Sequence, residues 1–207
     1  SFYNVGSPFA IFLWLFPSSW TPYLLGPMYA LKYAIAGLTA FLFLNRFVKN
    51  KKYAILGSIL YSFSGFQFTN MIFYHFHDAV AFFPLLLYGL DRLIKDDKKG
   101  VFALSVALNL FTNYFFFIGQ VVFVLLYYIV LNLTKHYDFT WKKFGQIALE
   151  SILGVLMGCI LLIPSIYFVI SNPRVGGSWN FMDMLIAPLS NVLEINSSLV
   201  KVFVFPA

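Results

Sequence analysis

Charged residues are scarce in this sequence of 207 residues. Only 11% of the residues are charged, whereas a soluble domain usually carries about 25%. Hydrophobic residues make up 60% of the chain, and the mean hydropathy is +0.80. Too little polar surface remains to cover a globule in water. The composition therefore excludes a soluble protein and indicates a membrane protein.

Cysteine and the common catalytic motifs are also scarce. Cys159 is the one cysteine of the sequence, which excludes a disulfide or a cysteine metal site within it and predicts a packed thiol. The sequence contains no glycine-rich phosphate loop, nucleophile elbow or zinc-protease helix motif. An enzyme built from it must work by positioning and acid–base chemistry on a membrane-borne substrate.

The net charge of +6 would also fit a nucleic-acid partner. The basic residues lie in short loops beside apolar runs, however, where membrane topology and anionic lipids explain them better. We expect the lipid bilayer as a partner and no nucleic acid. The chain starts at Ser1 without Met and ends inside an apolar run, so we expect it to be a piece of a longer protein.

Continuous apolar runs predict transmembrane helices, since about 20 apolar residues cross the roughly 30 Å of hydrocarbon in a bilayer. Runs that approach or exceed this length cover residues 23–44, 54–74, 79–94, 101–133 and 144–170. The fourth run is too long for one span, and we predict two short helices that meet near Asn113 to Gln120. The expected fold is an all-α transmembrane bundle with about six spans.

The positions of the basic residues support the split of the long run. Eleven of the 14 Lys and Arg residues lie in three loops: Arg46, Lys49, Lys51 and Lys52; Arg92, Lys95, Lys98 and Lys99; and Lys135, Lys142 and Lys143. The three loops share one side only if residues 101–133 form a hairpin. The positive-inside bias makes that side cytoplasmic.

This topology predicts one transmembrane domain fragment with three parts. Residues 1–22 form an external loop with a short interfacial helix, residues 23–170 form the bundle, and residues 171–207 form an external loop that leads to further spans. The turn from His75 to Asp78 and the segment near Asn113 then lie on the outer side.

The segment Phe73-Tyr-His-Phe-His-Asp-Ala79 carries two imidazoles and a carboxylate between apolar runs. Ionisable groups at a membrane boundary are functional candidates. Asp78 could be a general base or an electrostatic clamp with His77 or His75 as its hydrogen-bond partner, or His75 and Asp78 could help to hold a divalent cation. The alternative is a solvated interfacial turn.

Other polar residues extend this candidate site. Lys32 lies ten residues into the first span, where it needs a partner, a polar cavity or a path to the interface. Arg174, beside Gly176 and Gly177, suits phosphate oxygens or is a solvated side chain. Asn113 and Tyr114 could bind hydroxyl-rich ligands or form interhelical hydrogen bonds.

Glu150 lies near the cytoplasmic end of the last run, and we expect its carboxylate to be exposed at the membrane interface.

The order of several short segments resembles the YfhO family of bacterial membrane proteins. These segments are Gly6-Ser-Pro-Phe9, Leu31-Lys-Tyr-Ala-Ile-Ala-Gly-Leu38, Leu60-Tyr-Ser-Phe-Ser-Gly-Phe66, His77-Asp-Ala79 before Phe83-Pro-Leu-Leu86, and Thr112-Asn-Tyr-Phe115. The resemblance covers roughly residues 1–173. It implies a polytopic glycosyltransferase of the C superfamily (GT-C), which moves a sugar from a polyprenyl-phosphate donor to an extracytoplasmic cell-envelope polymer such as lipoteichoic acid.

In that superfamily the catalytic acid usually lies in the first external loop. We expect the chain to begin near the end of that loop, with this acid before Ser1. Asp78 matches the place of a second acidic residue, which can support base catalysis, donor phosphate, metal or acceptor. We therefore expect a bacterial cell-membrane enzyme with an extracytoplasmic site, in which Asp78 and His77 are catalytic.

The residues expected to bind substrate are His75, Lys32, Asn113, Tyr114 and Arg174. The rival hypotheses are a transporter or flippase of a lipid-linked or anionic substrate, and a non-catalytic scaffold.

Overall fold

The computed structural model describes residues 6–137 and 139–170. The chain divides into two compact units, residues 1–163 and residues 164–207. In the second unit the described residues, 164–170, form the end of the last helix. The predicted external loop at 171–207, with Arg174, lies outside the described residues.

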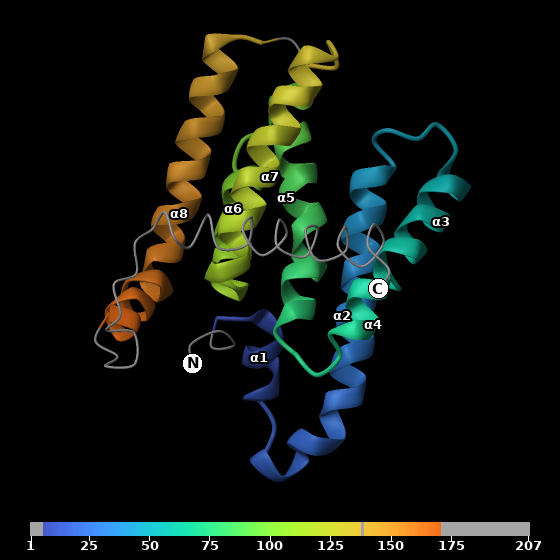
Figure 1. The fold of residues 1–207 in the computed structure, drawn as a ribbon, viewed down its shortest axis with the longest axis vertical. Coiled ribbons are helices and arrows are strands. Elements are labelled where there is room, and N and C mark those ends of the chain that lie inside the picture. The colour runs from blue at the N-terminus through green and yellow to red at the C-terminus, as the bar shows by residue number, and fades with distance from the viewer. Residues whose placement is uncertain (1–5, 138, 171–207) are drawn as a thin grey trace, which may run out of the picture. The chain divides into compact units, whose positions relative to one another are not determined.

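All regular elements of the described residues are helical, which confirms the all-α class (Figure 1). They are α1 (Pro8–Leu13), the 3-10 turn η2 (Ser18–Trp20), α2 (Thr21–Leu44), α3 (Lys51–Ser62), α4 (Gly65–Thr69), α5 (Phe76–Asp96), α6 (Val101–Thr112), α7 (Tyr114–Leu133) and α8 (Trp141–Ile170). Among the described residues, three segments are long and apolar enough to cross a membrane: Ser18–Leu44, Tyr114–Leu133 and Trp141–Tyr167. The predicted number of six spans is thus not confirmed.

The predicted hairpin in residues 101–133 is present, and the chain reverses at Asn113 (Figure 1). Asn113 has an extended backbone, and its Oδ1 accepts hydrogen bonds from the backbone N–H groups of Phe115 and Phe116 at 3.1 and 3.3 Å. These two N–H groups have no acceptor within the helix, so an Asn at this position both ends α6 and begins α7.

The predicted continuous span at residues 54–74 is wrong. Helix α3 ends at Ser62, and α4 begins at Gly65 after Ser64, which has an extended backbone. Ser and Gly both disfavour the helix interior, and their effect is lost when a run is scored only by its apolarity. The amide of Gln67 donates to the freed backbone oxygen of Ser62 at 2.8 Å.

One end of the bundle is held by a cluster that we call the Asp91 layer: Arg46, Asp91, Lys95, Asp96 and Tyr137. The buried Asp91 carboxylate pairs with the Arg46 guanidinium, lies 3.0 Å from Lys95 Nζ and accepts a hydrogen bond from Tyr137 Oη at 2.8 Å. Arg46 also binds both oxygens of Asp96 at 2.9 and 3.1 Å. These contacts place the three basic loops at one end, as the charge pattern predicts.

Two pKa shifts agree with the bonding in this layer. Burial and the hydrogen bond to Asp91 raise the pKa of Tyr137, so its phenol remains a donor at neutral pH. The hydrogen bonds from Arg46 to Asp96 raise the pKa of the guanidinium further above its usual value.

Glu150 is buried, which corrects the expectation of interfacial exposure. Its Oε1 accepts from the backbone N–H of Gly100 at 2.8 Å, and its Oε2 accepts from that of Ala103 at 3.1 Å. The carboxylate thus satisfies two N–H groups at the start of α6 and faces the positive end of its dipole. Helix α6 therefore begins with two of its first N–H groups bonded to a carboxylate of α8.

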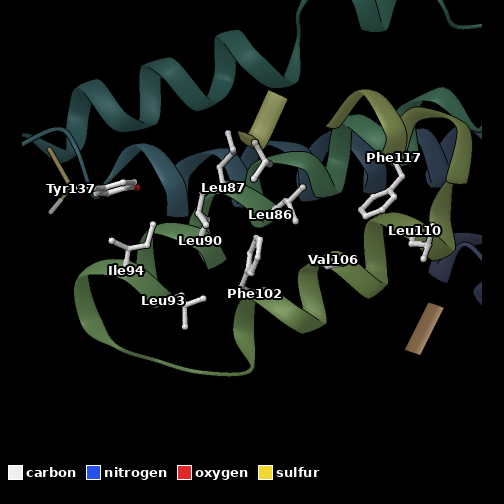
Figure 2. Close-up of a cluster of buried hydrophobic side chains, with 11 residues drawn as sticks. Leu86, Leu87, Leu90, Leu93, Ile94, Phe102, Val106, Leu110, Phe117 and Tyr137 are labelled. Atoms are coloured by element: carbon white, nitrogen blue, oxygen red, sulfur yellow. The ribbon is translucent and has the colours of Figure 1, made fainter. Parts of the chain in front are cut away.

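Apolar side chains from α5, α6 and α7 form the larger core cluster. Figure 2 shows side chains of α5, such as Leu86 and Leu90, facing Phe102 of α6. Gly89 permits this approach, because a Cβ atom there would lie 2.9 Å from Phe102 Cα.

We predict that Gly89→Ala lowers the unfolding midpoint of the full-length protein in detergent. Overpacking at this contact costs about 1 to 3 kcal/mol, which outweighs the gain of roughly 1 kcal/mol in helix propensity. Gly119→Ala on α7 is the matched control, since a Cβ there meets nothing within 4 Å. Equal midpoints for the two variants would contradict the close α5–α6 contact.

Candidate functional site

The other polar cluster of the bundle contains Lys32 on α2, Tyr74 before α5, and His77 and Asp78 in the first turn of α5. We call these four residues the Asp78 layer. Asp78 lies thirteen positions before Asp91 on α5, which corresponds to about 20 Å along a helix. The two layers therefore lie at opposite ends of α5.

Lys32 and Asp78 form a fully buried ion pair. Lys32 Nζ lies 2.5 Å from Asp78 Oδ1, and both side chains are 0% exposed. The ammonium also donates to the backbone oxygen of Tyr74 at 2.8 Å and lies over the ring of Tyr74. Of the three environments expected for the Lys32 ammonium, the structure shows a buried partner. Both charges would be costly at this depth if they were not paired.

Small residues bring the two helices of the pair together. Ala36 of α2 and Ala81 of α5 are both 0% exposed. Between them, Thr39 Oγ1 donates to the backbone oxygen of Ala81 at 2.7 Å. The close packing of α2 on α5 thus places Lys32 opposite Asp78.

His77 is 1% exposed and contacts the backbone of the preceding segment. Its Nε2 lies 3.0 Å from the carbonyl oxygen of Gln67, and its Nδ1 lies 3.4 Å from that of Phe73. The rings of Tyr29 and Tyr33 meet the imidazole edge-on, with centroids 5.1 and 5.8 Å away. His77 thus links α5 to α4 and to α2.

His75 directly precedes α5 and is partly exposed. Its ring packs edge-on against Phe76, with the centroids 4.7 Å apart. Burial lowers the pKa of His75, so its imidazole is largely neutral at pH 7. The described part of the chain holds no group of three His, Cys, Asp or Glu residues that suits a metal ion, and it offers no ligand set for the divalent-cation alternative.

Asn113 and Tyr114 lie at the same end as Asp78. The rings of Phe116 and Phe76 meet with centroids 4.8 Å apart, which brings the start of α7 beside the start of α5. Asn113 is buried and caps α7, while Tyr114 is partly buried as its first residue. An interhelical hydrogen bond from an amide is present at Asn109 of α6, whose Nδ2 donates to the backbone oxygen of Phe82 of α5 at 3.1 Å.

Sequence reasoning missed three contributors to the site: Gln67, Tyr29 and Tyr74. Gln67 is 1% exposed although its apolar neighbours, such as Phe66, lie outside the core. Tyr29 Oη donates to the backbone oxygen of Met71 at 2.5 Å. An amide inside an apolar run was the available signal for Gln67, whereas the two tyrosines resemble the many other tyrosines of the chain.

We predict that Lys32→Met lowers the stability of the full-length protein by about 3 to 5 kcal/mol, because it leaves the Asp78 carboxylate buried without its ammonium. The double variant Lys32→Met/Asp78→Leu removes both charges and should regain most of that loss. Chemical unfolding in detergent measures both effects. A double variant less stable than Lys32→Met would contradict the pairing.

Comparison with known proteins places this arrangement in a family. The chain matches the family described as "Bacterial membrane protein YfhO" over residues 1–199. A protein of Bacillus subtilis (strain 168), described as "Uncharacterized protein YfhO", is 21% identical over 131 residues. The match covers 61% of this chain and 15% of that relative's length. No solved structure matches the chain.

The apolar helices, the basic loops gathered at one end and the match over nearly the whole sequence lead to one conclusion: the chain belongs to the YfhO family of bacterial membrane proteins.

Proposed function

We propose that the chain is part of a membrane glycosyltransferase. It transfers a sugar from a polyprenyl-phosphate donor to an extracytoplasmic cell-envelope acceptor such as lipoteichoic acid. The observation that carries the proposal is the Lys32–Asp78 pair, which combines a cation for phosphate with a carboxylate for a hydroxyl proton. The reaction class comes from the GT-C superfamily, which the resemblance to the YfhO family implies.

The chemistry requires two charge changes. The acceptor hydroxyl loses a proton as its oxygen attacks the anomeric carbon, and the leaving polyprenyl phosphate takes up the bonding electrons. A carboxylate can accept the proton, and an ammonium can stabilise the phosphate. Asp78 and Lys32 provide these two groups.

In the structure, Lys32 and Asp78 bind one another, so each must exchange its partner before it acts. A donor phosphate that binds the Lys32 ammonium displaces Asp78 and leaves its carboxylate free to accept a proton. Binding of the donor is thereby coupled to activation of the acceptor. In this mechanism His77 is a positioning residue, since its contacts with Gln67 and Phe73 hold the first turn of α5 in place.

The depth of the site supports a lipid-linked substrate. The two polar layers are about 20 Å apart along α5, whereas the hydrocarbon of a bilayer is about 30 Å thick. At least one layer therefore lies below the headgroup level. The positive-inside bias assigns the Asp91 layer to the cytoplasm, and the Asp78 layer then faces outward.

A separate apolar cavity offers space for a hydrocarbon chain. It has a volume of about 330 Å³ and lies among α5, α6, α7 and α8. Its lining includes Leu86, Phe117, Val121 and Val155, and among the described residues one hydroxyl, that of Ser151, contributes to it. A cavity with such an apolar lining favours hydrocarbon over water.

We predict that Asp78→Asn reduces sugar transfer by membranes that contain the full-length protein by roughly 100-fold, which is the lower range for loss of a general base. Asp97→Asn is the matched control, because Asp97 is exposed and lies beyond the other end of α5. Transfer from a radiolabelled polyprenyl-phosphate sugar is measured, together with the amount of folded protein.

Asp78→Asn also leaves Lys32 without its carboxylate, so loss of activity by unfolding must be separated from loss of chemistry. The variant Lys32→Met/Asp78→Asn removes both charges and should remain folded but inactive. Transfer at the wild-type rate by this folded double variant would remove the pair from the mechanism.

A further inference from the structure

A second cavity, of about 520 Å³, lies between α2 and the last turn of α3. Its lining includes Tyr29, Tyr33, Ala34, Gly37, Ser62 and Phe63, and we call it the α2–α3 pocket. It lies at the end of α3, which stops at Ser62, two residues before the break at Ser64. In membrane proteins, backbone breaks of this kind are tolerated where they line a cavity or are buried in protein.

We propose that the α2–α3 pocket binds the neutral, hydroxyl-bearing headgroup of a glycolipid. The inference rests on the proposed function, because it gives the lipid-linked sugar a place beside the Lys32–Asp78 pair. The polar groups of the pocket, its aromatic wall and its position each support this ligand.

Three of the lining residues, Tyr29, Tyr33 and Ser62, carry hydroxyl groups, and the others are apolar. Tyr33 Oη is shielded from solvent and has no hydrogen-bond partner within the part of the chain that the structure describes. Tyr29 Oη donates to Met71, and its oxygen can still accept a hydrogen bond. Sites that are mainly apolar with a few convergent polar groups are typical of small-ligand pockets.

The aromatic wall consists of Tyr33 and Phe63, whose rings stack with centroids 5.4 Å apart and 8° between their planes. Ala34 and Gly37, on the same helix as Tyr33, are the small residues of the lining. A Cβ atom on Gly37 would be 3.6 Å from Ser62 Cβ. A sugar ring has a flat C–H face and a rim of hydroxyls, which matches a flat wall beside hydroxyl groups.

The uncharged lining of the pocket and its position beside Lys32 favour a sugar over a phosphate as its ligand. Among the residues that the structure describes, no charged side chain lines it. Tyr29 lines the pocket and also lies near the charged centre, since Lys32 Nζ is 5.9 Å from its ring centroid and the His77 ring is 5.1 Å away. A sugar in the pocket would thus lie one aromatic ring from Lys32, where the phosphate of the same lipid is proposed to bind.

The test is photo-crosslinking to the full-length protein in lipid nanodiscs. Two probes carry the same diazirine-bearing octyl chain: an octyl glucoside and an octyl phosphate. Peptide mass spectrometry then locates the labelled segments. We expect the glucoside to label residues 59–63, on the α3 side of the pocket, and the octyl phosphate to leave them at background.

Two variants and a control sharpen the test. Tyr33→Phe removes one hydroxyl and should lower glucoside labelling by roughly fivefold, the effect of one lost hydrogen bond. Ala34→Phe fills the pocket from an exposed position and should abolish the labelling. Gly119→Phe adds a phenyl group to an open site on α7 and should leave the labelling unchanged.

Three results would overturn the inference. Equal labelling by both probes would show a hydrocarbon site without headgroup recognition. Labelling that Tyr33→Phe and Ala34→Phe leave intact in folded protein would place the glucoside elsewhere. Protection of the pocket by another helix of the full-length protein, seen as crosslinks from Ala34→Cys to that helix, would exclude a lipid ligand.

The readout is independent of catalysis. Labelling retained by the folded but inactive variant Lys32→Met/Asp78→Asn supports the pocket whatever the pair does. Conversely, an Ala34→Phe variant that loses labelling but keeps sugar transfer would reject the pocket as the place of the donor sugar and leave the proposed function standing.

Discussion

The structure depends on the need to pair charges that are buried in an apolar protein. Two ion pairs, Lys32–Asp78 and Arg46–Asp91, join α2 to α5. The cations are fourteen positions apart, with Lys32 on α2 and Arg46 two residues past its end at Leu44, and the carboxylates are thirteen positions apart on α5. These spacings match when the two helices run in the same direction. A shift of α2 by one turn would separate both pairs and leave charges without partners, which is strongly destabilising.

The distance between the two pairs also accounts for the short helices. Helices α3 and α6 each have 12 residues, and about 18 Å of helix fits between the layers. The last residues of the two helices, Ser62 and Thr112, are buried, where water does not satisfy the backbone. Glu150 therefore caps the start of α6, Asn113 follows its end, and Gln67 binds the freed oxygen at the end of α3.

The Asp78 layer and the α2–α3 pocket are neighbours that offer different chemistry to a ligand. The charged pair suits proton and phosphate chemistry, whereas the pocket offers hydroxyl groups and an aromatic wall. Tyr29 belongs to both, since it lines the pocket and lies near Lys32 and His77. Under the proposed function, the two parts would hold the phosphate and the sugar of one lipid.

By itself, the sequence determined the helical membrane class, the hairpin within residues 101–133 and the common side of the basic loops. These features follow from local apolarity and from the even number of spans that must separate basic loops on the same side. Neither requires knowledge of packing. It also identified Lys32, His77 and Asp78 as unusual, because polar groups are conspicuous in apolar runs.

Only the tertiary structure decided how these groups are paired. Lys32 and Asp78 are 46 positions apart, and the sequence pattern does not show which of the available charges will meet. The burial of Glu150 was missed for the same reason, since it depends on contacts with a segment about 50 residues away. The break after Ser62 was missed because apolarity alone ignores the local effect of Ser and Gly. Side-chain chemistry determines which groups require partners, whereas helix packing determines which partner each one finds.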